Sequence, residues 1–447
     1  MPPAAFPPGF LWGAATSAYQ VEGSPLADGA GPSNWHRFCR TPGHVKGGDR
    51  GDVASDHYRR WPEDIRWMKE LGLTAYRFSV SWSRVLPEGT GPVNPKGLDF
   101  YKRLVDALGE NGIAPCATVF HWDLPAALED RGGWQNRDIA GWFADYASVL
   151  FRALDGGVRM WATLNEPWVV SDGGHLHGVL APGHRSLFEP PLVSHNLLRA
   201  HAAALAAYRA EGKHAIGIVV NLAPQHPASE AENDRAAARR ADAWMNRQFL
   251  DPLYRGGYPE ELAEIFGEAW PEFPSADFDA IRKPIDFLGV NYYTRTVVRH
   301  EPKSWPVHAA PVRQPGVHTE MKWEVYPEGL TEILLWVRDR YGPMPLYVTE
   351  NGSAFEDPAP AGDVVADPLR AAYLRDHLRA ARRALERGVD LRGYFAWSLL
   401  DNFEWAEGFS KRFGLIHVDY ETQKRTAKAS ARLYARVIAS AGSDLEA

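Results

Sequence analysis

Two glutamates stand in polar motifs that suit a pair of cooperating carboxyl groups. Glu166 lies between Asn165 and Pro167, and Glu350 follows Thr349 at the end of an apolar run. Two carboxyls in different surroundings can divide two roles, one acting as an acid and the other as a nucleophile. Cleavage of a glycosidic bond needs that division, because the leaving oxygen is protonated from one side while the anomeric carbon is attacked from the other. The pair therefore predicts glycoside cleavage, provided that the fold brings both carboxyls to one site.

Other polar residues could support this chemistry. Arg77, on the inward side of a predicted strand, would hold Glu350 ionised. Asn165 could donate a hydrogen bond to the 2-hydroxyl of a sugar. His121 and Asp123 form a pair that suggests a metal, but catalytic zinc takes three protein ligands. We therefore expect no metal and no cofactor.

The chain is rich in aromatic side chains, with 17 Trp, 17 Tyr and 19 Phe among 447 residues. Some of the tryptophans, such as Trp134, fall in or beside helix-like patterns and are expected in the core. Others follow predicted strands, where an aromatic plate would stack against the C–H face of a sugar ring. The expected sugar-stacking residues are Trp397, Trp405, Trp323 and Trp168.

The elements that must position these side chains are strands that alternate with helices. Short runs rich in Val, Ile, Phe and Tyr predict strands over 10–16, 75–80, 114–120, 160–166, 215–222, 286–293, 346–350 and 393–400. Helix-like patterns lie between them, one of them beginning at Pro62. Eight such units favour an α/β fold of the (β/α)8 TIM-barrel type, in which the carboxyl ends of all strands meet at one face. Glu166 and Glu350 would then face the same barrel mouth.

The length of the chain and the absence of linkers in its sequence favour a single domain over residues 1–447. No linker or low-complexity segment divides it. A TIM barrel needs about 250 residues and tolerates insertions, so the surplus is expected in long loops after the strands, over 23–56, 171–191, 295–323 and 354–367. The alternative doubly wound sheet would require a glycine-rich phosphate turn after the first strand, which residues 13–17 lack.

The composition limits the classes of binding partner and the cellular compartment that we expect. The formal net charge is −7, without a long basic run, which argues against nucleic acid and anionic membranes as partners. Two cysteines are too few for a disulfide framework, so a reducing compartment is expected. The N-terminal residues lack a charged and then apolar leader, and no apolar stretch is long enough to span a membrane. We expect a cytoplasmic, soluble protein of unknown oligomeric state.

Three motifs resemble those of glycoside hydrolase family 1 β-glucosidases, and the resemblance extends over essentially the whole chain. They are residues 10–23 (FLWGAATSAYQVEG), 163–167 (TLNEP) and 346–352 (LYVTENG). The resemblance implies that Glu166 is the general acid/base and Glu350 the nucleophile of a reaction that retains the anomeric configuration. By the same resemblance, Asn291 and Tyr293 flank the nucleophile, and the residues that hydrogen-bond the nonreducing sugar above the Trp397 platform are Gln20, His121, Asn165, Glu404 and Trp405.

The resemblance also indicates the substrate. Trp168 and Trp323 match the aglycone side, where Asn221 and Leu180 also stand. The intact pair Glu404 and Trp405 implies an unphosphorylated sugar, since a carboxylate there would repel a phosphate. Retention of a glutamate at the acid/base position implies ordinary O-glycosides.

We therefore expect a retaining exo-β-glycosidase that releases terminal β-D-glucosyl residues, and also galactosyl or fucosyl residues, from small β-glycosides such as cellobiose and from short β-linked oligosaccharides. Two alternatives remain at this point. One is a transglycosylating enzyme, in which an alcohol intercepts the glycosyl-enzyme. The other is a non-catalytic carbohydrate-binding barrel, because a fold alone does not determine function.

Overall fold

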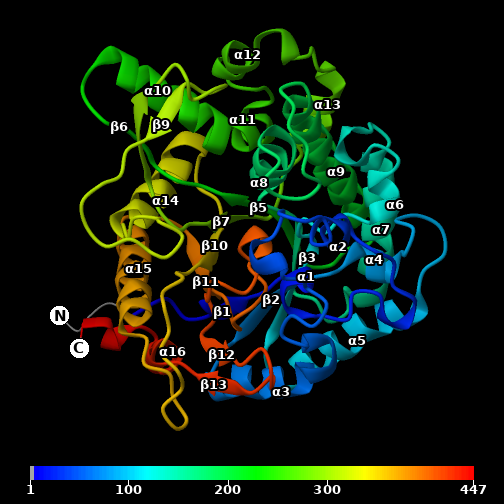
Figure 1. The fold of residues 1–447 in the computed structure, drawn as a ribbon, viewed down its shortest axis with the longest axis vertical. Coiled ribbons are helices and arrows are strands. Elements are labelled where there is room, and N and C mark those ends of the chain that lie inside the picture. Colours follow the sequence, from blue (N-terminus) through cyan, green and yellow to red (C-terminus); the bar gives the residue numbers. More distant parts are fainter. Residues whose placement is uncertain (1–4, 447) are drawn as a thin grey trace.

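The computed structural model describes residues 5–446; residues 1–4 and 447, which include both ends of the predicted domain, lie outside the described residues. Eight parallel strands close into a barrel in the order β1-β11-β10-β7-β5-β4-β3-β2, and helices follow the strands (Figure 1). The predicted (β/α)8 barrel is confirmed. Its strands are β1 (Leu11–Ala15), β2 (Ala75–Ser79), β3 (Ala114–Phe120), β4 (Met160–Asn165), β5 (Ala215–Asn221), β7 (Phe287–Asn291), β10 (Leu346–Asn351) and β11 (Leu391–Trp397).

The predicted strand boundaries agree with the observed ones to within three residues. The largest difference is at the last strand, which was expected to continue to Leu400 but ends at Trp397. Beyond Trp397 the chain leaves the barrel to pair with another segment. Leu399 O accepts a hydrogen bond from the Ile416 amide at 2.9 Å, and Leu400 forms a bridge with Ile416.

Apolar side chains pack against both faces of the barrel wall. One buried cluster contains Ala75, Met160, Phe287 and Phe395 from the strands themselves, as expected for the layered interior of such a barrel. Gly13 makes room for this interior, since a Cβ there would lie 2.3 Å from the Phe395 ring. A second, larger cluster joins the strands to the surrounding helices. The wall is therefore rigid, which suits it to hold side chains at its mouth.

A long helix follows almost every strand and covers the outside of the barrel. These helices are α3 (His57–Glu70), α5 (Pro95–Glu110), α7 (Ile139–Leu154), α9 (Glu189–Glu211), α11 (Gln248–Arg255), α14 (Glu328–Tyr341), α15 (Pro368–Glu386) and α16 (Ala429–Ala439). The prediction that a helix begins at Pro62 was wrong, because α3 begins at His57. Its additional first turn is held by tertiary contacts, including a hydrogen bond from the Tyr58 amide to Glu22 O at 3.0 Å.

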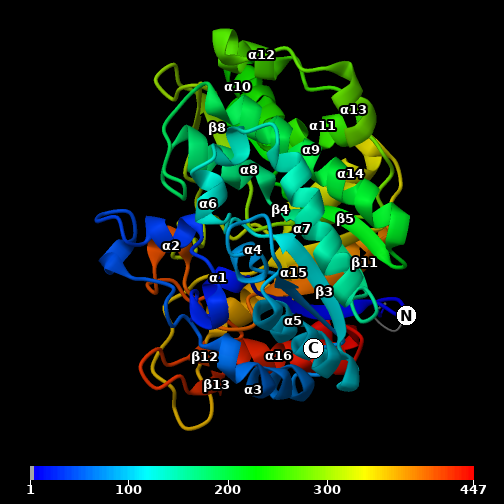
Figure 2. The ribbon, with the colours of Figure 1, turned by 90° about the vertical axis from the view of Figure 1, so that its right-hand side faces the viewer.

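The loops at the carboxyl ends of the strands are long, as predicted after β1, β4, β7 and β10. The segment between β5 and β7 is also long, and its helices gather at the top of Figures 1 and 2. It contains β6 (Gln225–Pro227), α10 (Glu232–Asp242), α12 (Glu261–Phe266) and α13 (Ser275–Ile281) in addition to α11. Strand β6 forms a small sheet with β8 (Thr296–His300) and β9 (Ala309–Pro311), which belong to the loop after β7.

The remaining elements are short and lie mostly in these loops. The α-helical turns are α1 (Ala18–Val21), α2 (Asn34–Phe38), α4 (Trp82–Val85), α6 (Ala126–Glu129) and α8 (Pro167–Val169). Two π-helical segments are η4 (Val170–Leu176) and η5 (Ala243–Arg247). The 3-10 turns are η1 (Ala27–Gly29), η2 (Lys46–Gly48), η3 (Gly133–Gln135), η6 (Gly267–Ala269), η7 (Trp405–Glu407) and η8 (Ser443–Glu446), and β12 (Ile416–Val418) pairs with β13 (Arg425–Ala427).

The first and last described segments lie side by side at the left of Figure 1, where the Phe6 amide donates to Ala441 O at 2.9 Å. None of the helices within residues 5–446 combines the length and the apolar character needed to cross a membrane.

Candidate active site

The two glutamates singled out by their motifs lie at the carboxyl ends of two barrel strands. Glu166 directly follows β4 and adopts a left-handed backbone conformation, with φ of 45°, where the chain turns from the strand into α8. Glu350 is the penultimate residue of β10, next to an irregularity in the pairing of that strand. Both side chains are buried, with 6% and 3% of the residue surface exposed, respectively.

A continuous hydrogen-bonded chain connects the two carboxylates. Asn291 Nδ2 donates to Glu166 Oε1 at 2.8 Å and to Asn165 Oδ1 at 3.2 Å. Asn165 Oδ1 also accepts from Arg77 Nη2 at 2.6 Å, and Arg77 Nη1 donates to Glu350 Oε1 at 2.7 Å. The structure therefore brings together four strands, β2, β4, β7 and β10, in one polar cluster at the barrel mouth.

The surroundings of the two carboxylates differ in charge. Glu350 is held by the Arg77 guanidinium on one oxygen and by the Tyr293 hydroxyl on the other, at 2.7 Å each. Burial raises the pKa of Glu350, while Arg77 and Tyr293 oppose that rise. Glu166 accepts a hydrogen bond from a neutral amide, and burial together with the charge of Glu350 holds its pKa well above the usual range. This asymmetry favours an ionised Glu350 next to a protonated Glu166.

His121 and Asn165 present donors beside the carboxylates. Burial, with the Arg77 charge added, holds the pKa of His121 well below its usual range, so the imidazole is neutral. Its Nε2 lies 3.1 Å from Asn165 Nδ2, whose amide oxygen is already occupied by Arg77. Nε2 is therefore the acceptor, and the ring proton resides on Nδ1, which is buried and has no partner among residues 5–446. That N–H is available to a ligand.

Residues from both ends of the sequence meet on another side of the mouth. Gln20, in α1, donates through Nε2 to Glu404 Oε2 at 3.2 Å and to Phe403 O at 3.0 Å. Burial and the charge of Glu350 raise the pKa of Glu404 to about 8, while the hydrogen bond from Gln20 lowers it. The influence of Glu350 places Glu404 in the same electrostatic environment as the paired carboxylates.

Aromatic rings surround these polar groups. The Trp397 ring, at the end of β11, stacks on His121 at 5.9 Å, and Trp405 stacks on the same imidazole at 6.0 Å. Trp323 lies 5.2 Å from the Tyr293 ring, on the side of Glu350. These three tryptophans thus contact residues of the polar cluster.

Trp168 packs against a different group of residues from the other predicted tryptophans. Its closest aromatic partner is Trp244 at 6.5 Å, and its indole N–H is buried without a partner in the described chain. Asn221 ends β5 in register with Asn291, and its side-chain oxygen has no partner among the same residues. Leu180 packs at the edge of the cluster that contains Trp405. None of the three makes a side-chain hydrogen bond to Glu166 or Glu350 in the described part of the chain.

Sequence reasoning missed several supporting residues. Thr349 donates through Oγ1 to Asn291 Oδ1 at 2.7 Å, which fixes the amide so that its NH₂ faces Glu166. Asn402 accepts from Gln20 at 3.2 Å, and Trp122 donates to the Asn165 carbonyl at 3.1 Å. Thr349 and Glu350 are neighbours on a strand and would normally point to opposite faces. The irregular register of β10 allows both to serve the site, and no sequence pattern reveals it.

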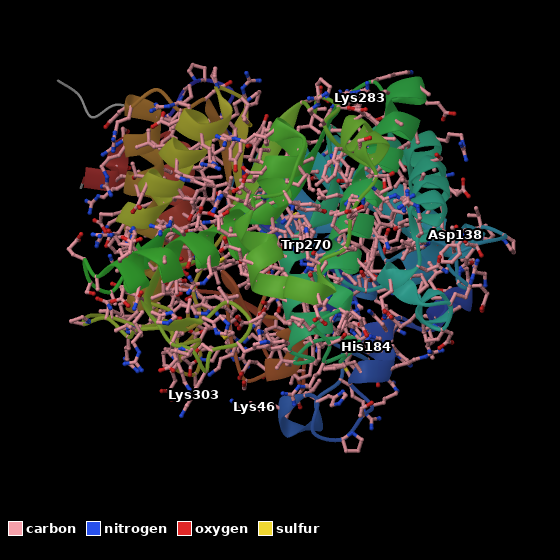
Figure 3. All side chains as sticks on the ribbon, turned by 90° about the horizontal axis from the view of Figure 1, so that it is seen from above. Lys46, Asp138, His184, Trp270, Lys283 and Lys303 are labelled. Carbon is pink, nitrogen blue, oxygen red and sulfur yellow. The ribbon has the colours of Figure 1, made fainter. Side chains whose placement is uncertain are left out.

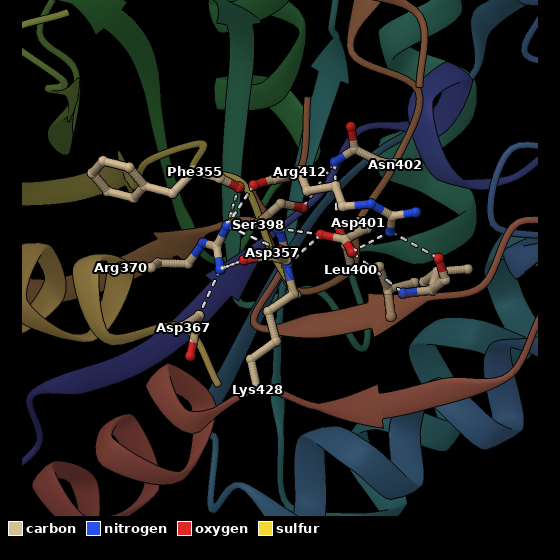
Figure 4. Close-up of polar contacts among 12 residues, drawn as sticks. Phe355, Asp357, Asp367, Arg370, Ser398, Leu400, Asp401, Asn402, Arg412 and Lys428 are labelled. Atoms are coloured by element: carbon tan, nitrogen blue, oxygen red, sulfur yellow. Dashed lines mark hydrogen bonds and ion pairs between the residues drawn. The ribbon is translucent and has the colours of Figure 1, made fainter. Parts of the chain in front are cut away.

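A buried charge network supports the loop that carries Glu404 and Trp405 (Figure 4). Lys428 Nζ donates to Asp401 at 2.7 Å and to Asp357 at 2.6 Å. Its other members are Arg370, Asp367 and Arg412, which join the loop after β10 to the loop after β11. Because each buried charge has an opposite partner, the network fixes these two loops relative to each other.

The carboxylate cluster does not have the ligands of a metal centre. The predicted pair of His121 and Asp123 gains no third ligand in the described part of the chain, and both Asp123 oxygens are buried without a partner there. Within residues 5–446, the group with metal-ligand geometry is His175, His184 and Glu189, on the loop after β4.

Known proteins resemble this chain over almost its full length. The family model described as Glycosyl hydrolase family 1 matches residues 3–443. A 1,4-beta-D-glucan glucohydrolase of Thermotoga neapolitana is 52% identical over 98% of this chain and 99% of its own length. Beta-glucosidase A of Thermotoga maritima is 52% identical over 98% of each chain. A solved structure, beta-glucosidase from Thermotoga maritima in complex with deoxynojirimycin, superposes with a TM-score of 0.96 at 52% identity, covering 98% of this chain and 99% of that one. On the strength of this match, which includes both carboxylate motifs, the chain belongs to glycosyl hydrolase family 1.

Proposed function

We propose that this protein is a retaining β-glucosidase that removes terminal β-D-glucosyl residues from the nonreducing ends of small β-glycosides. The observation that carries the proposal is the asymmetric pair of buried carboxylates, one held by a guanidinium and a phenol and the other by a neutral amide. The names of the two Thermotoga relatives, a beta-glucosidase and a 1,4-beta-D-glucan glucohydrolase, support a glucoside as the substrate.

In the first step, Glu350 attacks the anomeric carbon while the protonated Glu166 gives its proton to the departing glycosidic oxygen. The bond between the anomeric carbon and that oxygen breaks, and an ester bond to Glu350 forms. Arg77 and Tyr293 keep Glu350 ionised until it attacks, because both hydrogen bonds favour the charged form. The leaving group departs as an alcohol.

In the second step, the roles of Glu166 reverse. The ester no longer carries the negative charge of Glu350, so the influence that raised the pKa of Glu166 is removed. Glu166 can then take a proton from water as that water attacks the anomeric carbon. Glu350 leaves as a carboxylate, and two inversions restore the β-configuration. The same residue therefore serves as acid and then as base.

Polar groups beside the two carboxylates would hold the sugar. We infer that the free Nδ1–H of His121, the Asn165 amide and the Glu404 carboxylate hydrogen-bond its hydroxyls, with Gln20 orienting Glu404. Trp397 would form the platform under the ring, and Trp405, which stacks on the same His121 imidazole, would hydrogen-bond a hydroxyl. Some contacts to the hydroxyls would become stronger as the sugar ring flattens toward the transition state. Such contacts accelerate the reaction more than they increase the affinity for the substrate.

The leaving group would extend toward the periphery of the mouth, where Trp168, Trp323, Asn221 and Leu180 lie. An apolar Leu180 and two indoles favour an aglycone with an apolar face, and Asn221 offers an unpartnered polar oxygen. Short β-linked oligosaccharides such as cellobiose fit this description, and galactosyl and fucosyl substrates are included in the proposal.

The proposal extends to the organisation and location of the chain. We infer that residues 1–447 act as one domain in the cytoplasm. Cys39 and Cys116 are both buried and unpaired, which suits a reducing compartment. A single cooperative unfolding transition would support the single domain.

A panel of nitrophenyl glycosides tests the activity. The purified protein is expected to hydrolyse the β-glucoside and not the α-glucoside, with β-glucose as the first product by nuclear magnetic resonance. A 6-phospho-β-glucoside should react poorly, because Glu404 would face its phosphate. First release of α-glucose would refute retention. Absence of any turnover would favour the carbohydrate-binding alternative, and predominance of alkyl glucoside in the presence of added alcohol would favour the transglycosylating one.

A further inference from the structure

Two imidazoles and one carboxylate converge outside the active site, on the loop after β4. His175 lies in η4, His184 follows the turn at Pro182, and Glu189 begins α9. Glu189 Oε2 lies 2.7 Å from His175 Nδ1 and 2.9 Å from His184 Nδ1, and the two imidazole rings meet edge to face at 5.2 Å. The ligand atoms of all three side chains lie within 4.8 Å of one another.

The main chain holds the three side chains in this arrangement. The His184 amide donates to Gly174 O at 2.9 Å, and the Ser186 amide donates to His175 O at 3.0 Å. The segment that carries His184 is therefore fastened directly to the π-helical segment that carries His175. Because these backbone contacts do not involve the imidazoles or Glu189, the side-chain cluster is organised before any ligand arrives.

The cluster combines a buried end with an accessible one. His175 is fully buried, whereas 40% of the His184 side chain and 21% of the Glu189 side chain are exposed, so an ion can enter from solvent on their side. Figure 3 shows His184 in the lower half of that view. His175 Nε2 has no partner among the described residues, so Glu189 is the one described hydrogen-bond partner of that ring. A small shift of the ring therefore breaks no other hydrogen bond.

The charges around the cluster favour a cation. Glu189 supplies a carboxylate to the triad, and Glu129 lies close enough to interact electrostatically with all three residues.

We propose that His175, His184 and Glu189 bind one Zn²⁺ ion. Two imidazoles and a carboxylate are a donor set that zinc takes in proteins, with water as the fourth ligand of a tetrahedron. Bonds of about 2.0–2.1 Å place neighbouring ligand atoms about 3.3 Å apart. The two contacts to Glu189, at 2.7 and 2.9 Å, would lengthen by about half an ångström, and ligand atoms that are now as much as 4.8 Å apart would move toward each other. On binding, zinc takes the place of the proton on each Nδ1. A neutral ring then carries its proton on Nε2, whereas an imidazolium releases the Nδ1 proton to solvent and keeps the one on Nε2.

A bound zinc ion would join three points on the loop that begins at Glu166. The segment runs from Glu166 through Trp168 into η4, and Leu180 lies between His175 and His184. The ion would fasten the outer part of this loop to the first turn of α9. Its expected effect is stabilisation of the native state, because an ion that binds only the folded chain raises the free energy of unfolding. The inference does not depend on the proposed activity.

Metal titration of the full-length protein tests the site. After treatment with a chelator and its removal, Zn²⁺ is titrated calorimetrically, and Co²⁺ is titrated by visible absorption as a spectroscopic substitute. We expect one ion per chain and the intense bands of tetrahedral Co²⁺. The His184→Ala variant should lose more than the 10–100-fold in affinity that removal of an outer-shell partner typically costs. His184 is partly exposed, so the variant is expected to fold.

Matched variants separate this site from weak surface binding. His177→Ala removes an exposed histidine of the same loop that lies 3.7 Å from Asp172 and outside the triad, and it should bind zinc as the wild type does. Glu189→Gln keeps the shape of the side chain and should weaken binding through loss of its charge. Zinc should raise the melting temperature of the wild type and of His177→Ala but not of His184→Ala. Absence of one-to-one binding, an octahedral Co²⁺ spectrum, or equal affinity in His184→Ala and the wild type would overturn the proposal.

Discussion

Replacement of Tyr293 by Phe removes one hydroxyl from the proposed nucleophile and leaves the aromatic ring in place. That hydroxyl donates to Glu350 Oε2 at 2.7 Å, and Glu350 is only 3% exposed. A hydrogen bond to a charged group contributes about 1.5–3 kcal/mol. Because Tyr293 favours the ionised form of Glu350, its loss raises the pKa of that carboxyl.

The acidic limb of kcat/KM reports this pKa, since Glu350 must be ionised in the free enzyme to attack. The limb should therefore move to higher pH in Tyr293→Phe. On that limb kcat/KM should fall by about 10- to 150-fold, because each 1.4 kcal/mol is a factor of ten. The assay is the pH dependence of kcat/KM on nitrophenyl β-glucoside.

Tyr292→Phe is the matched control. Tyr292 is the adjacent residue, is buried, and donates its hydroxyl to Tyr326 O, away from the carboxylates. This variant is expected to lose stability but to keep the wild-type position of the acidic limb. The reasoning fails if Tyr293→Phe leaves the limb in place, or if both variants move it equally.

Four further substitutions probe the site and its support. Glu350→Gln should abolish hydrolysis of an activated β-glucoside, because an amide is a poor nucleophile; wild-type turnover would exclude Glu350. Glu166→Ala should still react with a dinitrophenyl β-glucoside but scarcely with cellobiose. Added azide should accelerate the reaction of the dinitrophenyl substrate and yield β-glucosyl azide. An α-azide product would contradict retention. Above pH 8, where Glu404 is ionised, Glu404→Ala should lower kcat/KM about tenfold or more, as expected for a lost charged hydrogen bond of about 1.5–3 kcal/mol, and an unchanged value would remove Glu404 from the proposed sugar site. Lys428→Met should lower the free energy of unfolding by about 3–5 kcal/mol, because Asp401 would lose a buried partner; denaturant titration measures this, and an unchanged midpoint would show that the ion pair contributes little.

The strands of the barrel could be predicted because local sequence determines them strongly. Strands buried on both faces appear as short apolar runs, and in this chain they stay distinct from the helices between them. Helix α3 shows a feature that the local sequence does not determine. Its first turn depends on contacts with the loop after β1, such as the hydrogen bond between Tyr58 and Glu22, which proline spacing does not encode.

The candidate site could likewise be predicted only in part from the sequence. Glu166, Glu350 and their neighbours in the motifs could be predicted because barrel topology places the ends of all strands at one face. The function of Thr349 could not, because it depends on an irregularity in strand pairing. The hydrogen-bond network around His121 likewise required the structure, since only the partners of Asn165 determine which imidazole nitrogen carries the proton. The roles assigned to these residues remain predictions.

The pairing of β1 with β11 has a consequence for synthesis of the chain. During translation, Gln20 emerges early and Glu404 near the end, yet the two side chains form one hydrogen-bonded contact. Until β11 leaves the ribosome, the exposed edges of β1 and β10 have no partner, and unpaired strand edges promote aggregation. The sheet of the nascent chain therefore stays open during most of its synthesis. The contact between Gln20 and Glu404 forms only after the last strand closes the barrel, so a chain released from a ribosome stalled before that point would lack this side of the mouth.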